Sequence, residues 1–186
     1  MRKIALFATL LTTIFIGGCD SLLEEEESDN NITNITENVD FVAVSATCAH
    51  YPAGSREYTD RENYTIELLG TEVGSMRDAM ILDLINPKGT PSPVGTYEVA
   101  NIGSFLALPR YDVTDLATGQ TFYGGSFYGR AVDGYIGDYF AFLTSGTVII
   151  AHNPESNTYT ITVDARSGDY TIRVAFEGPM TITKVE

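Results

Sequence analysis

Several residue types and motifs that carry chemistry are rare or missing from the sequence. There are only two cysteines and two histidines among 186 residues. The HExxH, CxxC, phosphate-binding-loop and G-x-S-x-G patterns are absent, and no run of acidic residues has the spacing of a calcium-binding loop. These absences remove the sequence signatures of the common metallopeptidase, dithiol, nucleotide-binding and serine-hydrolase classes, and we assign no catalytic residue, metal site or cofactor.

Basic residues are scarce as well. The chain has 11 Lys and Arg against 25 Asp and Glu, for a formal net charge of −14. Such a surface repels phosphate backbones and anionic lipid headgroups, which argues against nucleic acid as a partner. Loss of residues 1–18 would remove Arg2 and Lys3 and so change the net charge from −14 to −16.

The start of the chain has the pattern of a secretory signal. Met1-Arg2-Lys3 precedes an apolar run from Ile4 to Ile16, which is too short to be a permanent membrane-spanning helix. The next residues complete the sequence Ile16-Gly17-Gly18-Cys19, which resembles the lipobox of bacterial lipoproteins. The resemblance implies that residues 1–18 are a signal peptide and that Cys19 receives a diacylglyceryl group and, on its new amine, a further acyl chain such as palmitate. An ordinary signal peptide with a chance cysteine is the alternative.

Residues 19–40 have the composition of a disordered acidic tether. They are rich in Glu, Asn, Ser and Thr, and the four glutamates from Glu24 to Glu27 repel one another. A flexible coil of this length would hold a domain about 25 Å from the membrane. The acidic cluster resembles the surface-export signal of Bacteroidota lipoproteins, and Asp20-Ser21-Leu22 resembles their O-glycosylation acceptor. These resemblances imply an outer-membrane lipoprotein facing the cell exterior, although a plain solvated spacer and the periplasmic face stay open.

Residues 41–186 have the alternation of an all-β domain. Apolar and polar residues alternate from Thr158 to Arg166 and again from Tyr170 to Phe176, on either side of Ser167-Gly168-Asp169, which predicts a hairpin. The nearly all-apolar stretch Ala79 to Ile85 predicts a central strand that is covered on both faces. About eight to ten short strands joined by short turns predict a single antiparallel meander, folded as a β-sandwich or a flattened or closed, lipocalin-like β-barrel.

Short strand and turn segments in the C-terminal half resemble the small, uncharacterised all-β surface lipoproteins of Bacteroidota. They are "GTY" at Gly95, "SGTVII" at Ser145, "YTITVD" at Tyr159 and "FEGPM" at Phe176. The resemblance implies a fold and a location, and it transfers no catalytic residue.

The segment from Gln120 to Phe142 holds eight of the chain's twenty aromatic residues, with glycines between them. Flat rings beside small residues are suited to stack on sugar faces, while Arg and Asp bond the hydroxyls. The candidate ligand-binding residues are therefore Tyr123, Tyr128, Arg130, Asp133, Tyr135, Asp138 and Tyr139. The competing interpretation is that Gly124-Gly125-Ser126 is a hairpin turn and that the rings pack in the core.

Two further interpretations involve catalysis or metal binding. Cys48 and His50 share one face of a strand, and His152 is the other imidazole, so a nucleophile pair or part of a metal site is conceivable, although a buried inert thiol is commoner. The second interpretation is a glycosidase-like pair of carboxylates. Asp112, Asp115, Asp133 and Asp138 are the acids best placed to lie near one rim of the domain.

We expect a membrane-anchored cell-surface lipoprotein that acts as a non-catalytic binding or structural accessory, with a glycan or a protein as its ligand. A subunit or assembly partner of a surface complex or fimbria-like polymer is the alternative, and a small hydrolase is third.

Overall fold

A computed structural model describes residues 33–54, 60–101, 103–114 and 121–185. The expected signal peptide, the lipidation residue Cys19 and most of the expected tether lie outside these residues, as does Asp115. Thirteen strands and no helix are present in the described part of the chain, which confirms the all-β class. The strands are β1 (Val39–Tyr51), β2 (Arg61–Gly70), β3 (Met76–Pro87), β4 (Gly95–Val99), β5 (Leu106–Ala107), β6 (Tyr111–Thr114), β7 (Thr121–Gly124), β8 (Phe127–Val132), β9 (Tyr135–Phe142), β10 (Ser145–Asn153), β11 (Thr158–Ser167), β12 (Tyr170–Gly178) and β13 (Met180–Lys184).

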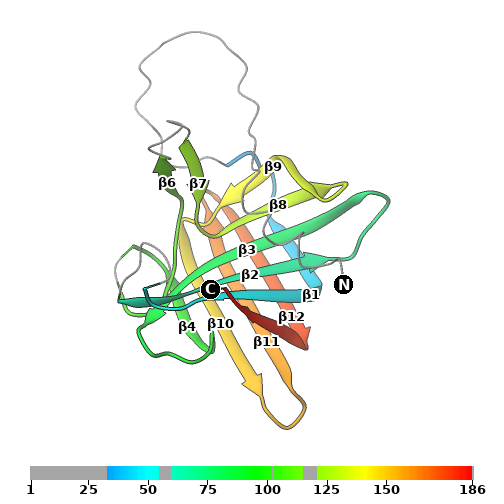
Figure 1. Ribbon diagram of the computed structural model, residues 1–186. Helices are drawn as coiled ribbons and strands as arrows, with labels where there is room; N and C mark the ends of the chain where they lie inside the picture. Colours follow the sequence, from blue (N-terminus) through cyan, green and yellow to red (C-terminus); the bar gives the residue numbers. More distant parts are fainter. Residues whose placement is uncertain (1–32, 55–59, 102, 115–120, 186) are drawn as a thin grey trace.

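Of the expected architectures, the chain adopts the closed barrel. Its ring of 8 strands runs β1-β2-β3-β5-β4-β10-β11-β12 and returns to β1 (Figure 1). The expected antiparallel meander holds for β1-β2-β3 and for β10-β11-β12. It is interrupted at β4 and β5, which are parallel neighbours. A closed ring of strands must contain an even number of antiparallel pairs. In a ring of 8 strands, one parallel pair therefore requires a second, and the closing pair β1-β12 is parallel.

Three pieces lie outside the ring. The β8-β9 hairpin pairs with the first half of β3 and continues the sheet beyond the barrel. Strand β13 continues the course of β12 along the second half of β1. Strands β6 and β7 form a separate two-stranded sheet, which stands away from the barrel at the top of Figure 1.

The barrel interior is a packed hydrophobic core. The inward side chains of β2, Tyr64, Ile66 and Leu68, are fully buried, and large apolar side chains from the other ring strands join them in one cluster. An eight-stranded barrel is just wide enough inside for side chains to fill. In the described residues, the side chains packed in the interior therefore contribute to the stability of the barrel.

The predicted central strand is confirmed as a strand covered on both faces. Met80 and Leu82 of β3 point into the barrel, whereas Ile81 packs on the other face against a separate cluster of Phe127, Phe140 and Phe142. The outer cluster forms because the β8-β9 hairpin extends the sheet beside β3, where Phe127 is the direct cross-strand partner of both Ile81 and Phe142. This arrangement explains the near absence of polar residues from Ala79 to Ile85.

The turn predictions had mixed outcomes. The hairpin around Ser167-Gly168-Asp169 is confirmed as β11-β12, with Gly168 at a positive φ of 57°. The hairpin turn at Gly124-Gly125-Ser126 is wrong, because β7 pairs with β6 while β8 pairs with β3 and β9. Gly125 instead connects the two sheets at a φ of 117°, and a Cβ there would overlap the carbonyl of Pro109.

Candidate functional site

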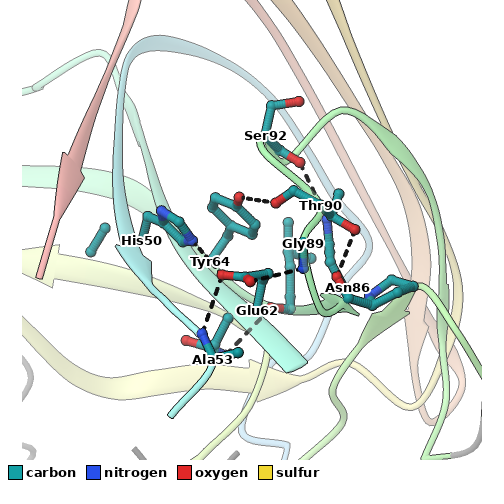
Figure 2. Close-up of polar contacts among 12 residues, drawn as sticks. His50, Ala53, Glu62, Tyr64, Asn86, Gly89, Thr90 and Ser92 are labelled. Atoms are coloured by element: carbon teal, nitrogen blue, oxygen red, sulfur yellow. Dashed lines mark hydrogen bonds and ion pairs between the residues drawn. The ribbon is translucent and has the colours of Figure 1, made fainter. Parts of the chain in front are cut away.

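A buried carboxylate, Glu62, lies at the start of β2. Its Oε2 is 2.8 Å from His50 Nε2 and accepts the Ala53 N–H at 3.3 Å, while its Oε1 accepts the Gly89 N–H at 3.0 Å (Figure 2). We call these four residues the Glu62 clamp. It joins the end of β1, the turn that follows β1 and the loop that follows β3.

The charge of Glu62 is favoured by this setting. Burial alone would raise the pKa of its carboxyl, but the hydrogen bonds from Gly89, His50 and Ala53 outweigh burial and lower the pKa below its usual value. The His50 ring also stacks on Tyr64, with centroids 4.4 Å apart and planes at 9°. Tyr64 in turn donates its hydroxyl to the Thr90 carbonyl at 2.8 Å. The clamp and the Tyr64 hydroxyl therefore hold the loop after β3 against the start of β2.

The Cys48 and histidine interpretations find no support in this geometry. Cys48 is buried, and burial raises the pKa of its thiol to about 12, so the thiol stays protonated at neutral pH. His50 binds Glu62, whereas His152 binds Asn157 at 3.2 Å and stacks on Tyr159. No group of three or more His, Cys, Asp and Glu residues suited to a metal occurs in the described ranges. The expectation of a buried, inert thiol is the one that fits.

A second buried carboxylate, Asp83, lies on the outer face of β3. Its two oxygens accept hydrogen bonds from Asn63 Nδ2 and Tyr111 Oη, each at 2.6 Å, and its N–H donates to Ser126 Oγ at 3.0 Å. Because both carboxylate oxygens are used within the fold, Asp83 anchors the start of β6 to the barrel wall. We assign it a structural role.

The structure brings three of the predicted ligand-binding residues together with a fourth that the sequence did not single out. The Tyr128 hydroxyl donates to Asp78 Oδ1 at 2.6 Å, and Arg130 Nε lies 3.6 Å from the same oxygen. The Arg130 guanidinium also lies 4.5 Å from the centre of the Tyr139 ring. Tyr128 itself is fully buried, so its ring offers no surface to a ligand.

The other predicted residues are more dispersed. Tyr135, Asp133 and Asp138 are exposed at the β8-β9 hairpin, and Asp133 occupies the turn with a positive φ of 51°. Tyr123 belongs to β7, where its backbone pairs with Asp112; the side chains of these two residues lie outside the described part.

Sequence reasoning missed the apolar partners of Tyr135. Val132 is paired with Tyr135 across β8-β9 and with Met76 across β8-β3, and Met76 bridges to Val73 at the β2-β3 turn. Directly paired residues point to the same face of a sheet. We call Val73, Met76, Val132 and Tyr135 the hairpin-tip patch. The alternation around each residue shows a strand, but only the register between hairpins shows that the four are neighbours.

The described ranges contain no helix with the length and hydropathy needed to span a bilayer. Comparisons of the chain with protein-family models, with curated proteins and with solved structures find no match.

Proposed function

We propose that this chain is a membrane-anchored cell-surface lipoprotein whose β-barrel is a non-catalytic binding accessory. The observation that carries the binding role is the hairpin-tip patch. Its four side chains are 71%, 48%, 41% and 68% exposed for Val73, Met76, Val132 and Tyr135, although most large apolar residues of the domain are buried. A contiguous exposed apolar patch on a monomeric domain commonly marks an interaction site.

The non-catalytic assignment rests on how the reactive groups are used. The Glu62 and Asp83 carboxylates accept hydrogen bonds from their own fold, and the Cys48 thiol is buried and protonated. Groups committed in this way do not serve as acid, base or nucleophile without breaking contacts that hold the barrel together. Capture of a glycan or a protein at the β8-β9 hairpin needs none of them.

The anchor is proposed from the sequence Ile16-Gly17-Gly18-Cys19, with the acidic segment after it as the spacer on an outer membrane. Two or more acyl chains on Cys19 would hold the chain stably at a bilayer. Mass spectrometry of the mature protein should find an acylated Cys19 at the amino terminus, and Cys19→Ser should release the protein from the membrane fraction. An unacylated terminus, or one that begins elsewhere, would refute the anchor without bearing on the barrel.

Glycan binding at the β8-β9 hairpin is tested separately. If Tyr135 stacks on a sugar face, Tyr135→Ala should abolish retention on a glycan array and leave the melting temperature unchanged. Val42→Ala is the matched control, because Val42 is 68% exposed on β1, outside the hairpin-tip patch. Equal retention of wild type and Tyr135→Ala, or loss of retention in the Val42→Ala control, would contradict a sugar site at this hairpin.

A second candidate function is assembly with other subunits, which the open strand edges favour. β9 and β13 are the terminal strands of the main sheet, so each has one edge without a complete partner strand. Such edges are templates for strand addition. Assembly predicts a larger species in size-exclusion chromatography that Thr181→Pro on β13 reduces to a monomer; a monomer at all concentrations would exclude self-assembly through that edge.

A further inference from the structure

The hairpin-tip patch lies where two hairpins project side by side beyond the barrel. The turns after β2 and after β8 extend together at the right of Figure 1, and the Asp133 N–H donates to the Ser75 carbonyl at 2.9 Å, which joins them. Met76 and Val132 are direct cross-strand partners. The four apolar side chains therefore form one surface on a connected support rather than two independent loop tips.

Two exposed acidic residues adjoin this surface. Glu72 adjoins Val73 and Asp133 adjoins Val132 along the chain; both are exposed, and neither has an ion-pair partner in the described part of the chain. Asp138 is exposed as well, but alternation along β9 turns it to the face opposite Tyr135. The two basic residues of the same ribbon face carboxylates of their own. Arg130 pairs with Asp78, and the charge of Arg77 acts on Glu67. Glu72 and Asp133 therefore form a negative border beside the patch, with no ion-pair partner for either in the described residues.

This charge pattern discriminates among the occupants that an apolar patch can have. A second copy of the chain would bring the same acidic border against itself, because a two-fold interface places like surfaces together. An anionic bilayer or a nucleic acid would be repelled in the same way. The expected tether also meets the fold far from the patch, since Thr33 bridges to Ala141, about 20 Å along β9 from Tyr135.

We infer that the hairpin-tip patch docks a basic protein segment, one that presents apolar side chains flanked by Lys or Arg. The apolar side chains would cover Met76, Val132 and Tyr135, and the cationic flanks would meet the acidic border. Tyr is enriched among interface residues that dominate binding energy, and complementary charges accelerate the encounter. This inference names the ligand class of the binding role proposed above and rests on it.

The test uses the full chain carrying Cys19→Ser and three synthetic 15-residue peptides as probes. The peptides share one apolar core and differ only in flanking residues, which give net charges of about +4, 0 and −4. Fluorescence anisotropy should detect binding of the positive peptide, at least about tenfold weaker binding of the neutral one, and none of the negative one. Raising the ionic strength should weaken the binding of the positive peptide.

Variants separate docking at the patch from diffuse attraction to an acidic protein. Met76→Ser with Tyr135→Ser keeps every charge and should weaken binding of the positive peptide at least about tenfold. Val42→Ser with Val44→Ser removes equally exposed apolar side chains on β1 and should leave binding unchanged. Equal binding by the two double variants, or equal binding of all three peptides, would overturn the inference.

Other outcomes identify the alternative occupants. Patch-dependent binding to phosphatidylcholine vesicles, to a glycan array or to a second copy of the chain, with no preference for the positive peptide, would refute a basic protein ligand and leave a binding role in place. Absence of patch-dependent binding to any of these probes would refute both the inference and the proposed binding role.

Discussion

The Glu62 clamp gives the sharpest stability prediction. The carboxylate accepts hydrogen bonds on both oxygens from Gly89, Ala53 and His50. Glutamine has the same shape but only one acceptor oxygen, so its NH₂ group would face one or two of these donors. A buried donor left unsatisfied costs about 1–3 kcal/mol, and the remaining hydrogen bonds would lose their charge-assisted strength. We expect Glu62→Gln to lower the free energy of unfolding by about 2–3 kcal/mol.

The matched control is Glu67→Gln on the same strand. Glu67 points to the opposite face of β2, where burial raises the pKa of its carboxyl in spite of the charge of Arg77 and a weak hydrogen bond from Thr47. A raised carboxyl pKa means that the fold disfavours the charged form at neutral pH. We therefore expect Glu67→Gln to be as stable as the wild type or slightly more stable at pH 7.

The pH dependence of the free energy of unfolding tests the same reasoning independently. The pKa of Glu62 is lowered in the fold, so its stabilising contribution is present above the unfolded carboxyl pKa of about 4.3 and is lost as the pH falls through the lower folded value. The pKa of Glu67 is raised, so its contribution is present below about 4.3 and is lost as the pH rises through the folded value. The stability gap between the wild type and Glu62→Gln should narrow as the pH falls below about 4.

Urea unfolding followed by circular dichroism at pH 7 and at lower pH measures both effects, since the chain has no tryptophan to report by fluorescence. The loss should also appear as a melting temperature about 4–10 °C lower for Glu62→Gln. A free energy of unfolding for Glu62→Gln within about 0.5 kcal/mol of the wild type would show that the carboxylate is not a clamp. Equal losses of unfolding free energy in Glu62→Gln and Glu67→Gln would mean that the hydrogen bonds to Glu62 do not stabilise the fold.

Three further predictions concern the surroundings of single residues. The Cys48 thiol should react with iodoacetamide at pH 8 at least about a hundredfold more slowly in the folded chain than in urea, measured by peptide mass spectrometry, and rapid native labelling would contradict its burial. Gly146→Ala should lower the melting temperature, because Gly146 has a φ of 121° and a Cβ there would overlap the β11 backbone, whereas Gly137→Ala, with open space at its Cβ, should not. Tyr111→Phe removes the hydroxyl that binds Asp83, so amide hydrogen exchange should accelerate in β6 and β7 while the barrel strands keep their protection, and unchanged exchange would deny the anchor.

The parts of the fold that sequence predicts are those that depend on neighbours in the chain. The alternation in β11 and β12 and the apolar run in β3 are local patterns, and both identify their strands. The parallel closure of the barrel is not local. It follows from the β4-β5 connection, where six residues separate two short strands, and nothing in their composition indicates a parallel pair.

The candidate site shows the same division. Adjacent residues of a strand point to opposite faces, and Phe127 and Tyr128 accordingly join different clusters. Sequence does not show that both of these rings are buried, because the burial of each face depends on the strands that pair with β8. The sequence did contain a pattern that indicates the role of Glu62. It continues the inward alternation of Tyr64 and Ile66, and an acid at an inward position needs a hydrogen-bond partner.

The hairpin-tip patch differs from the core in a way that makes its role separable from folding. Tyr128 is fully buried and donates to Asp78, so a substitution there changes the stability of the fold. Tyr135 is 68% exposed at the end of a hairpin, and its truncation removes little buried area. An exposed apolar side chain beside Asp133 and Glu72 contributes little to folding and lowers the solubility of the domain. The proposed partner would offset this cost by covering the patch.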